Sequence, residues 1–311
     1  MKNLTRRRFI SIAAAAGLTS TTAQASSVAR WRGAALGARA EIFLTGLTEQ
    51  DARPIFASIE TELERLERIF SLYQPESAIV RLNRDGYLAE PPAELLQLCS
   101  LVSVLHRNSK GAFDPTVQPL WNYLASVVVT GGTPDPNRIG EALDLVDWTK
   151  LEVNSSRISF ARPGMAITLN GVAQGYITDR IAAKLRSIGL TDVLVDVGEI
   201  VASGKAADGK PWQVGIAPHD DTDVVARITL SDRALATSAP LGTVLDPAGK
   251  LGHIINPKAG LVSSKLRQVS VSATSASVAD GLSTAICAAG PACAEEVLAG
   301  FPDARIESMV V

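Results

Sequence analysis

Residues 51–70 carry an apolar side chain at every third or fourth position, namely Ile55, Ile59, Leu63, Leu66 and Phe70. This spacing predicts an amphipathic helix, and Asp51 is suited to cap its start. The opposite face is rich in Glu and Arg, and Pro75 forces a break after the helix. A long helix with one apolar stripe requires a substantial core to pack against, and the chain of 311 residues is long enough to supply one.

Two more helices are predicted, with an ordered turn and a loop in the middle of the chain. One helix covers residues 93–108 and stops before Gly111, and another covers 278–289 and ends at Gly290 and Pro291. Thr274 or Ser275 can cap the second of these helices. Glycine, aspartate and proline in residues 111–116 indicate an ordered turn, and residues 125–137 read as a loop.

Strands dominate the second half of the chain. A strand is predicted at 34–44 and a hairpin at 151–160, and the later strands are 212–217, 226–230, 234–237, 253–255 and 269–273. Turn-rich spacers such as residues 246–249 separate them. Helices interleaved in one half and strands clustered in the other favour an α+β fold, and no linker or repeat divides residues 26–311.

Residues 166–197 predict a strand, a glycine turn, a helix and a second strand, which together form a βαβ unit. The turn lies in Asn170–Tyr176, where glycines let the backbone approach a ligand and the helix start offers N–H groups to an anion. The spacing matches neither GxGxxG nor the Walker A pattern, so neither nucleotide-binding motif is predicted.

The first 25 residues read as an export signal. A basic segment with Arg6, Arg7 and Arg8 precedes a short apolar run and the small-residue site Ala23-Gln24-Ala25. The arginine pair favours the twin-arginine route, which carries folded proteins to the periplasm, over an ordinary signal with an incidental arginine. Cleavage after Ala25 leaves residues 26–311 as a mature chain without stable membrane insertion.

Charge and cysteine content exclude some classes of protein. There are 30 Lys and Arg against 32 Asp and Glu, and no basic run follows the signal, so nucleic acid is excluded as a partner. The three cysteines form no metal-binding CxxC pair. The preferred interpretation is that the three cysteines are small, buried, apolar side chains. The alternative, in an oxidising compartment, is a disulfide between Cys287 and Cys293.

Several side chains have both a catalytic and a structural reading. Asp280 and Thr284 lie four apart on one helix face, where their oxygens could ligate a hard cation, or Asp280 could complement the helix dipole. Tyr73 could stack on a planar ligand or pack into the core. His253 could contact a phosphate or move a proton, or simply end a strand, and Asp114 is expected to cap its turn.

Taken together, these stretches resemble the ApbE family, the FAD:protein FMN transferases. The matching stretches run in order along the mature chain: Leu36–Ala38, Ser71–Tyr73, Glu76–Asn83, Gly111–Val117, Pro119–Leu120, Asn170–Asp179, Val195–Ile200, Thr237–Ser238, His253–Gly260 and Ala279–Thr284. The resemblance implies a single T-fold-like domain with mixed or antiparallel sheets and packed helices.

The resemblance also implies an activity. FAD is cleaved at its pyrophosphate, FMN passes to a threonine hydroxyl of an acceptor protein, and AMP leaves. It implies Mg²⁺ ligands at Gly171, Asp280 and Thr284, and catalytic roles for Asp280 and His253. The implied FAD contacts are Leu36, Tyr73, Ala112, Phe113, Asp114, Gln174, His253 and Ile254.

The chain also departs from the family pattern. Gln174 stands where lysine is frequent and Asn256 where aspartate is usual, and Ala239 follows Ser238 in place of glycine. Together with the export signal, the sequence NGVAQGY most resembles the NosX branch, whose acceptor is the periplasmic flavin domain of a NosR-type electron-transfer protein. Two other functions fit the same residues: an FAD pyrophosphatase, and an FAD carrier without turnover.

Overall fold

A computed structural model describes residues 27–217, 224, 226–245, 249, 251–258, 260 and 266–311. The strands in these ranges are β1 (Val28–Ala35), β2 (Ala38–Thr45), β3 (Tyr87–Ala89), β4 (Leu151–Val153), β5 (Arg157–Phe160), β6 (Val193–Asp196), β7 (Ile200–Ser203), β8 (Trp212–Ile216), β9 (Ala226–Leu230), β10 (Arg233–Ser238), β11 (Gln268–Ala273) and β12 (Arg305–Val310). The predicted export signal, residues 1–25, lies outside the described residues.

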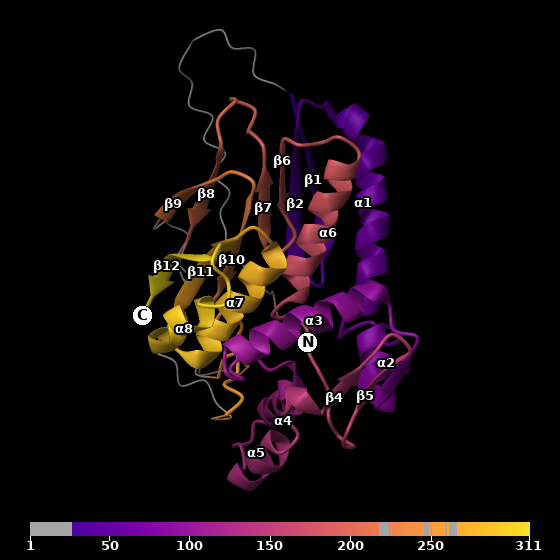
Figure 1. Cartoon of the computed structure of the whole chain (residues 1–311), viewed down its shortest axis with the longest axis vertical. Helices are drawn as coiled ribbons and strands as arrows, with labels where there is room; N and C mark the ends of the chain where they lie inside the picture. The colour runs from indigo at the N-terminus through magenta and orange to yellow at the C-terminus, as the bar shows by residue number, and fades with distance from the viewer. Residues whose placement is uncertain are drawn as a thin grey trace.

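Most of the helices lie in the first two thirds of the chain, before the run of strands β6 to β11 (Figure 1). The helices are α1 (Glu49–Phe70), α2 (Ala78–Asp85), α3 (Ala93–Asn108), α4 (Gln118–Val129), α5 (Pro136–Leu143), α6 (Ala173–Ser187), α7 (Ala276–Ala289) and α8 (Ala294–Leu298), with 3₁₀ turns η1 (Pro115–Val117), η2 (Trp148–Lys150) and η3 (Pro291–Cys293). Among the described residues, no helix combines the length and the apolar character needed to cross a membrane.

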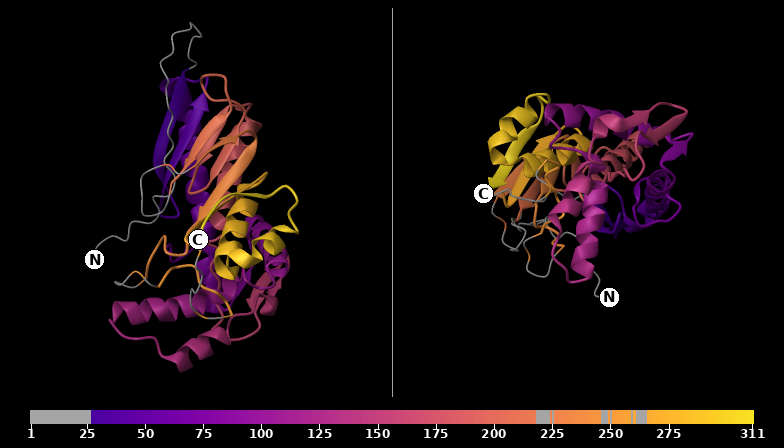
Figure 2. Two further views of the ribbon diagram at one scale, coloured as in Figure 1. Left: turned by 90° about the vertical axis from the view of Figure 1, so that its left-hand side faces the viewer. Right: turned by 90° about the horizontal axis from the view of Figure 1, so that it is seen from below.

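Seven strands form one antiparallel sheet in the order β1-β2-β6-β7-β10-β11-β12. A three-stranded sheet (β3-β5-β4) and the hairpin β8-β9 complete the β-structure. Figure 2 shows α4 and α5 together at one end of the molecule, away from the large sheet. The predicted α+β class with antiparallel sheets and packed helices is confirmed.

The middle strands of the large sheet, such as β7 and β11, are buried on both faces, and successive residues point to opposite faces. In β2, Ile42 and Leu44 face the main core, which lies under α1, α6 and α7, whereas Phe43 belongs to a second apolar cluster. Residues of the hairpin β8-β9, such as Trp212, join that second cluster. The hairpin therefore covers the sheet face that the helices leave open.

The predicted helix 51–70 is confirmed as α1, with a start two residues earlier. Thr48, rather than Asp51, is the N-cap, and its hydroxyl accepts a hydrogen bond from the Asp51 backbone N–H. Ile59, Leu63 and Leu66 are buried as predicted. The helix ends at Phe70, so the chain leaves it well before Pro75.

The strand predicted at 34–44 is confirmed over residues 38–44, which belong to β2, but its first residues are the end of β1 and the turn that joins the two strands. Ala35 pairs with Ala38, and the two residues between them, Leu36 and Gly37, both have positive φ, at 47° and 77°. Two consecutive residues with φ above zero make the tight turn that matches the twist of paired strands. The turn places Leu36 at the edge of the sheet, beside the cavity described below.

The predicted βαβ unit is also wrong. Residues 166–169 join no strand, and β6 pairs antiparallel to both β2 and β7. The backbone of Ile167 is satisfied instead by the Asn83 side chain, which accepts from its N–H at 2.8 Å and donates to its C=O at 2.9 Å. A side-chain amide thus replaces a neighbouring strand, and the segment remains extended without joining a sheet.

Other predicted elements agree closely. The helix 93–108 matches α3, the hairpin 151–160 matches β4-β5, and four of the five later strands match β8 to β11. The strand at 253–255 is wrong, and the loop at 125–137 is shortened by the end of α4 and the start of α5. Of the spacer 246–249, only Gly249 is described. Strands β1, β3, β7 and β12 were not predicted.

The preferred prediction for the cysteines is confirmed for Cys99 and Cys287, which are buried. Cys293 is half-buried, and the three cysteines form no disulfide with one another. Burial raises the pKa of the Cys99 thiol to about 12, so it stays protonated and behaves as a small apolar side chain.

Helices α6 and α7 cross in direct backbone contact at Gly175. A Cβ on this residue would lie 2.3 Å from the Ala276 carbonyl oxygen and 2.7 Å from the Ser277 Cα. Both neighbours are backbone atoms, so neither can rotate away. Glycine at 175 therefore fixes how closely the two helices approach.

We expect Gly175→Ala to destabilise the protein by about 1–3 kcal/mol, because the added methyl group forces α6 and α7 apart. Gly140→Ala is the matched control. A Cβ at residue 140, inside α5, meets nothing within 4 Å, so alanine there should stabilise by about 0.5–1 kcal/mol through helix propensity. Urea unfolding of both variants measures the two effects, and equal stabilities for the two would contradict the packing argument.

Candidate active site

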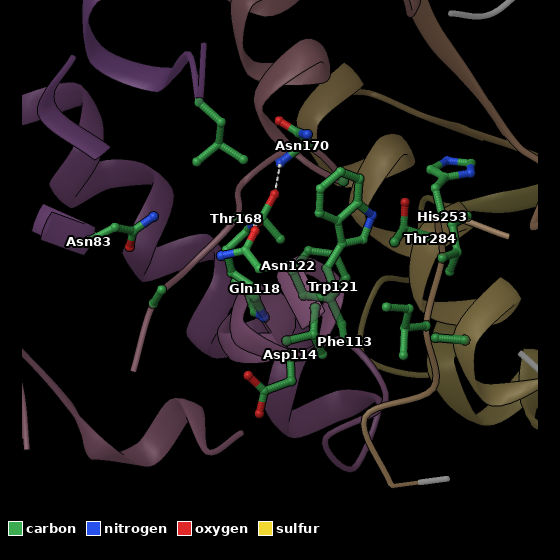
Figure 3. A pocket seen from close by; sticks show the side chains of 18 of the residues that line it. Asn83, Phe113, Asp114, Gln118, Trp121, Asn122, Thr168, Asn170, His253 and Thr284 are labelled. Atoms are coloured by element: carbon green, nitrogen blue, oxygen red, sulfur yellow. Dashed lines mark hydrogen bonds between the residues drawn. The ribbon is translucent and has the colours of Figure 1, made fainter. Parts of the chain in front are cut away.

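A cavity of about 590 Å³ opens where segments distant in sequence meet. It is bordered by the β1-β2 turn, the loop after α1, residues 112–122, the extended segment 164–171, the start of α6, residues 253–255 and one face of α7. Figure 3 shows side chains from these elements pointing toward a common space. The volume lies in the range of about 300–1,000 Å³ that is usual for cofactor and small-molecule sites.

The structure brings nearly all predicted site residues to this cavity. Those that line it are Leu36, Tyr73, Ala112, Phe113, Asp114, Gly171, Gln174, His253, Ile254 and Thr284. Asp280 does not reach the cavity surface and is only 1% exposed. It lies one helical turn before Thr284 on α7, as the spacing predicted.

Gly171 and Thr284 touch. A Cβ at residue 171 would lie 2.9 Å from the Thr284 Cγ2 and 3.1 Å from its Oγ1, so only glycine lets the backbone come this close to the hydroxyl. The turn before α6 is thereby held against the middle of α7. The predicted grouping of a backbone carbonyl with a threonine hydroxyl is possible in this geometry.

Asp280, one turn before Thr284 on α7, binds the first turn of α6. Its Oδ2 accepts a hydrogen bond from the Gly175 backbone N–H at 3.1 Å. A carboxylate, a hydroxyl and a carbonyl are oxygen donors, which suit a hard cation such as Mg²⁺. No group of three His, Cys, Asp or Glu side chains suited to a metal occurs in the described part of the chain, so a cation here requires such mixed donors. The residues present fit that requirement.

Asp179 fixes the start of α7. Its carboxylate accepts from the Ala276 and Ser277 backbone N–H groups at 2.7 and 2.9 Å, and from the Ser275 and Ser277 hydroxyls at 2.7 and 2.8 Å. Asp179 belongs to α6, one turn after Gly175. The two helices are thus joined by Asp179 at one point and by Gly175 and Asp280 at another, which sets the rotation of α7.

A chain of hydroxyl groups supports Thr284 from the sheet side. Ser238, at the end of β10, lies with its Oγ 3.3 Å from the Thr284 Oγ1 and 2.7 Å from the Ser283 Oγ. Ser283 donates in turn to the Asp280 carbonyl at 3.0 Å. These contacts restrict the Thr284 rotamer without adding charge.

His253 follows the bridge between Val244 and Gly252 and is half-buried at the cavity wall. Its Nδ1 lies 3.2 Å from the Thr243 carbonyl oxygen and 3.3 Å from the Thr243 backbone nitrogen. Figure 3 places the ring beside Thr284. The Thr243 contact orients the imidazole at the cavity wall.

Asp114 holds the loop together. It caps η1 by accepting from the Thr116 backbone N–H at 2.9 Å, and its Oδ2 accepts from the Trp148 N–H at 3.1 Å. Burial raises the pKa of its carboxyl, against the lowering effect of these donors and of nearby His106. The expectation that Asp114 caps a turn is confirmed, and its bonded carboxylate makes the loop rigid where it meets the cavity.

Tyr73 and Gln174 lie in contrasting surroundings. Tyr73 is 60% exposed at the rim, so its ring can be covered by a planar ligand, and core packing is not its role. Gln174 is 6% exposed and packs on Gly198, where a Cβ would lie 2.7 Å from the Gln174 Nε2. The backbone of Gly198 has φ 92°, so glycine is required there for both reasons.

Sequence reasoning missed several polar and aromatic residues of the cavity wall, which are Asn83, Arg84, Gln118, Trp121, Asn122, Thr168, Asn170 and Thr243. Asn83 lies within a stretch that carried the family resemblance, and Trp121 directly follows another. Neither stretch alone indicates which side chains point inward.

The wall carries little charge. Among the described residues, Arg84 and Asp114 are the charged side chains that line the cavity. Arg84 is half-exposed and pairs with Asp85, Nε to Oδ1, at 2.8 Å. A ligand with several negative charges would therefore find few compensating protein charges inside.

The chain forms an antiparallel α+β domain with a cofactor-sized cavity, and oxygen donors lie near the base of that cavity. These features are typical of enzymes that bind a nucleotide or another cofactor. The model of the ApbE family matches residues 36–307, and the chain belongs to that family.

Proteins similar to this chain share one name. The FAD:protein FMN transferase of Klebsiella pneumoniae (strain 342) is 28% identical over 295 residues, covering 90% of this chain and 84% of that protein. The FAD:protein FMN transferase of Haemophilus influenzae is 29% identical over 255 residues, covering 77% of this chain and 73% of that protein.

Solved structures show the same fold. The flavin transferase ApbE from Vibrio cholerae superposes with a TM-score of 0.80 at 24% identity, covering 92% of this chain and 94% of that one. The apo form of the Pseudomonas stutzeri flavinyl transferase ApbE has a TM-score of 0.74 at 26% identity, covering 88% and 87%. The predicted fold and family are confirmed.

Asp196, at the end of β6, precedes the turn that contains Gly198, and the pKa of its carboxyl is raised. Burial raises the pKa of Asp196 to about 7, against the hydrogen bond from the Gly198 N–H, and nearby Glu41 raises it further. A pKa raised in the folded state stabilises the protein at low pH, and this contribution is lost as pH rises through about 7.

We therefore expect wild-type stability, relative to Asp196→Asn, to fall as pH rises from about 4 to about 8. Asp303→Asn is the control, because hydrogen bonds from Thr274 lower the pKa of Asp303 below its usual value, so its contribution changes only below about pH 4 and its difference curve should be flat between about pH 4 and pH 8. Denaturant unfolding across this pH range tests the difference, and a flat difference curve for Asp196→Asn would contradict it.

Proposed function

We propose that this protein is an FAD:protein FMN transferase. The observation that carries the proposal is the close contact of Gly171 with Thr284 at the wall of a cofactor-sized cavity, with the Asp280 carboxylate buried one helical turn before Thr284. Membership of the ApbE family and the shared name of the similar proteins support the same activity.

In this proposal the cavity wall binds FAD. Tyr73 stacks on the isoalloxazine ring, and Leu36, Ala112, Phe113, Gln174 and Ile254 contribute contacts around the cofactor. The role of Asp114 is to keep residues 112–113 in place, because its carboxylate is engaged by Thr116 and Trp148.

Gly171, Asp280 and Thr284 would hold Mg²⁺, which when bound would offset the negative charge of the pyrophosphate and make AMP a better leaving group. The acceptor threonine oxygen attacks the phosphorus of the FMN half, the bond to the AMP phosphate breaks, and AMP leaves with the electron pair. His253 is positioned at the cavity wall to take the proton of the threonine hydroxyl.

We also propose export of the protein by the twin-arginine route and action in the periplasm. The basic segment and the Ala23-Gln24-Ala25 site support this location. The resemblance of the glycine turn to the NosX branch supports an acceptor of the NosR type, a periplasmic flavin domain within nitrous oxide respiration.

The proposed Mg²⁺ ligands can be tested by measuring FMN transfer to an acceptor protein. With FAD, Mg²⁺ and a NosR-type flavin domain, the mature protein should add the mass of one FMN phosphoryl adduct to the acceptor. Asp280→Asn and Thr284→Val should each slow this transfer by at least about a hundredfold, since metal assistance is worth several kcal/mol. Intact-mass spectrometry of the acceptor over time measures the rate.

Asp303→Asn is the matched control, because Asp303 accepts from the Thr274 N–H and hydroxyl just before α7 but does not line the cavity. It should transfer at the wild-type rate. An unmodified acceptor with free FMN in solution would identify a pyrophosphatase instead. Intact FAD that stays bound, with two different acceptors unmodified, would identify a carrier.

A further inference from the structure

Strand β10 extends beyond its neighbour β7 in the large sheet (Figure 1). The two strands pair only at residues 233–235 of β10, where Leu235 lies opposite Ile200, the first residue of β7. Within the described residues, Thr237 and Ser238 therefore lack a strand partner on the β7 side, whereas β11 covers their other side. A backbone N–H that is buried on the β7 side needs an acceptor from elsewhere.

The side chain of Glu199 supplies that acceptor. Its Oε2 accepts a hydrogen bond from the Thr237 backbone N–H at 3.2 Å, and Glu199 is only 1% exposed. The Glu199 backbone is fixed as well, because its carbonyl oxygen accepts from the Val197 N–H at 3.1 Å and lies 3.3 Å from the Thr178 Oγ1 of α6. The carboxyl group thus holds the end of β10 where no strand does.

The last residue of β10 is attached to α7. The Ser238 Oγ lies 2.7 Å from the Ser283 Oγ and 3.3 Å from the Thr284 Oγ1, and the Ser238 carbonyl accepts from the Cys287 thiol at 3.5 Å. All three partners belong to α7. The place of this strand end, which Glu199 holds, therefore decides which contacts surround Thr284.

We infer that Glu199 is a positioning residue for the proposed reaction, which holds the end of β10 so that Ser238 keeps the Thr284 hydroxyl in place at the cavity wall. The inference rests on the proposed function, in which Thr284 is a ligand of the cation. Glu199 does not line the cavity, so it has no direct contact with a ligand bound there. Side chains that support a metal ligand in this way commonly change metal affinity by about ten- to a hundredfold when they are replaced.

The surroundings of Thr284 can be followed without metal, substrate or turnover. In mature protein with ¹³C-labelled threonine methyl groups, the NMR signal of Thr284 is the one missing from Thr284→Ser. Glu199→Met keeps the length of the side chain but removes its strong acceptor, so the Thr284 signal should shift. Glu199→Gln keeps an acceptor oxygen, so its Thr284 signal should stay at the wild-type position.

Calorimetric titration with Mg²⁺ measures the consequence for the cation. Glu199→Met and Ser238→Ala should each weaken Mg²⁺ binding about tenfold, and Glu199→Gln should weaken it less than about twofold. Because Glu199 acts through Ser238, the double variant Glu199→Met/Ser238→Ala should also bind about tenfold more weakly than wild type, whereas two independent effects would multiply to about a hundredfold. If Glu199→Met does not fold, Glu199→Asp takes its place, because its carboxyl is one methylene shorter and does not reach the Thr237 N–H.

Three outcomes overturn the inference. They are an unmoved Thr284 signal in Glu199→Met, an unchanged Mg²⁺ affinity of that variant, and a loss of about a hundredfold in the double variant, which would give Glu199 a route independent of Ser238. A wild-type protein that binds no Mg²⁺, but whose Thr284 signal responds to Glu199→Met and not to Glu199→Gln, would reject the proposed cation site and leave the positioning of Thr284 by Glu199 standing.

Discussion

The crossing of α6 and α7 is the constraint on which the rest of the site depends. Gly175 brings the two backbones into contact, its N–H binds the Asp280 carboxylate, and Asp179 holds the first turn of α7 through four hydrogen bonds. Each of these interactions is short and directional, so together they define both the distance and the rotation of α7. A helix fixed in this way can present one chosen side chain, Thr284, to the cavity with little freedom to move.

The large antiparallel sheet supports the two crossing helices, and the other walls of the cavity lie around them. Its strands β10 and β11 pack on α7, and β6 and β7 pack on α6, so the two helices share one platform. The opposite wall comes from α4 and the extended segment 164–171, which is fixed by the amide of Asn83. The cavity thus lies between a rigid helix pair and a wall held largely by side-chain hydrogen bonds, which explains why its lining comes from so many separate parts of the chain.

The local sequence pattern was sufficient to predict elements whose pairing or packing partners lie nearby in the chain. The helix α3 and the hairpin β4-β5 follow from periodicity and turn residues, and Asp280 and Thr284 share a helix face because of their spacing alone. It was insufficient where a distant residue decides the structure. The segment 166–169 has the composition of a strand, but Asn83, 84 residues before Ile167, occupies its backbone groups. Trp121 likewise sits in an apolar helix, where sequence cannot distinguish a core residue from one facing a cavity.

The scarcity of charge in the cavity bears on how the proposed substrate would be held. Arg84 is half-exposed and paired with Asp85, and residue 174 is a buried glutamine, so among the described residues little positive charge faces the interior. An FAD pyrophosphate brought into such surroundings requires compensation from a cation, since an uncompensated charge in a partly buried site is costly. Under the proposed function, binding of FAD and binding of Mg²⁺ are therefore coupled, and each is expected to strengthen the other by the same factor. Ring stacking and amide contacts then supply the part of the affinity that does not depend on the cation, which is consistent with a wall built mainly of aromatic, amide and hydroxyl groups.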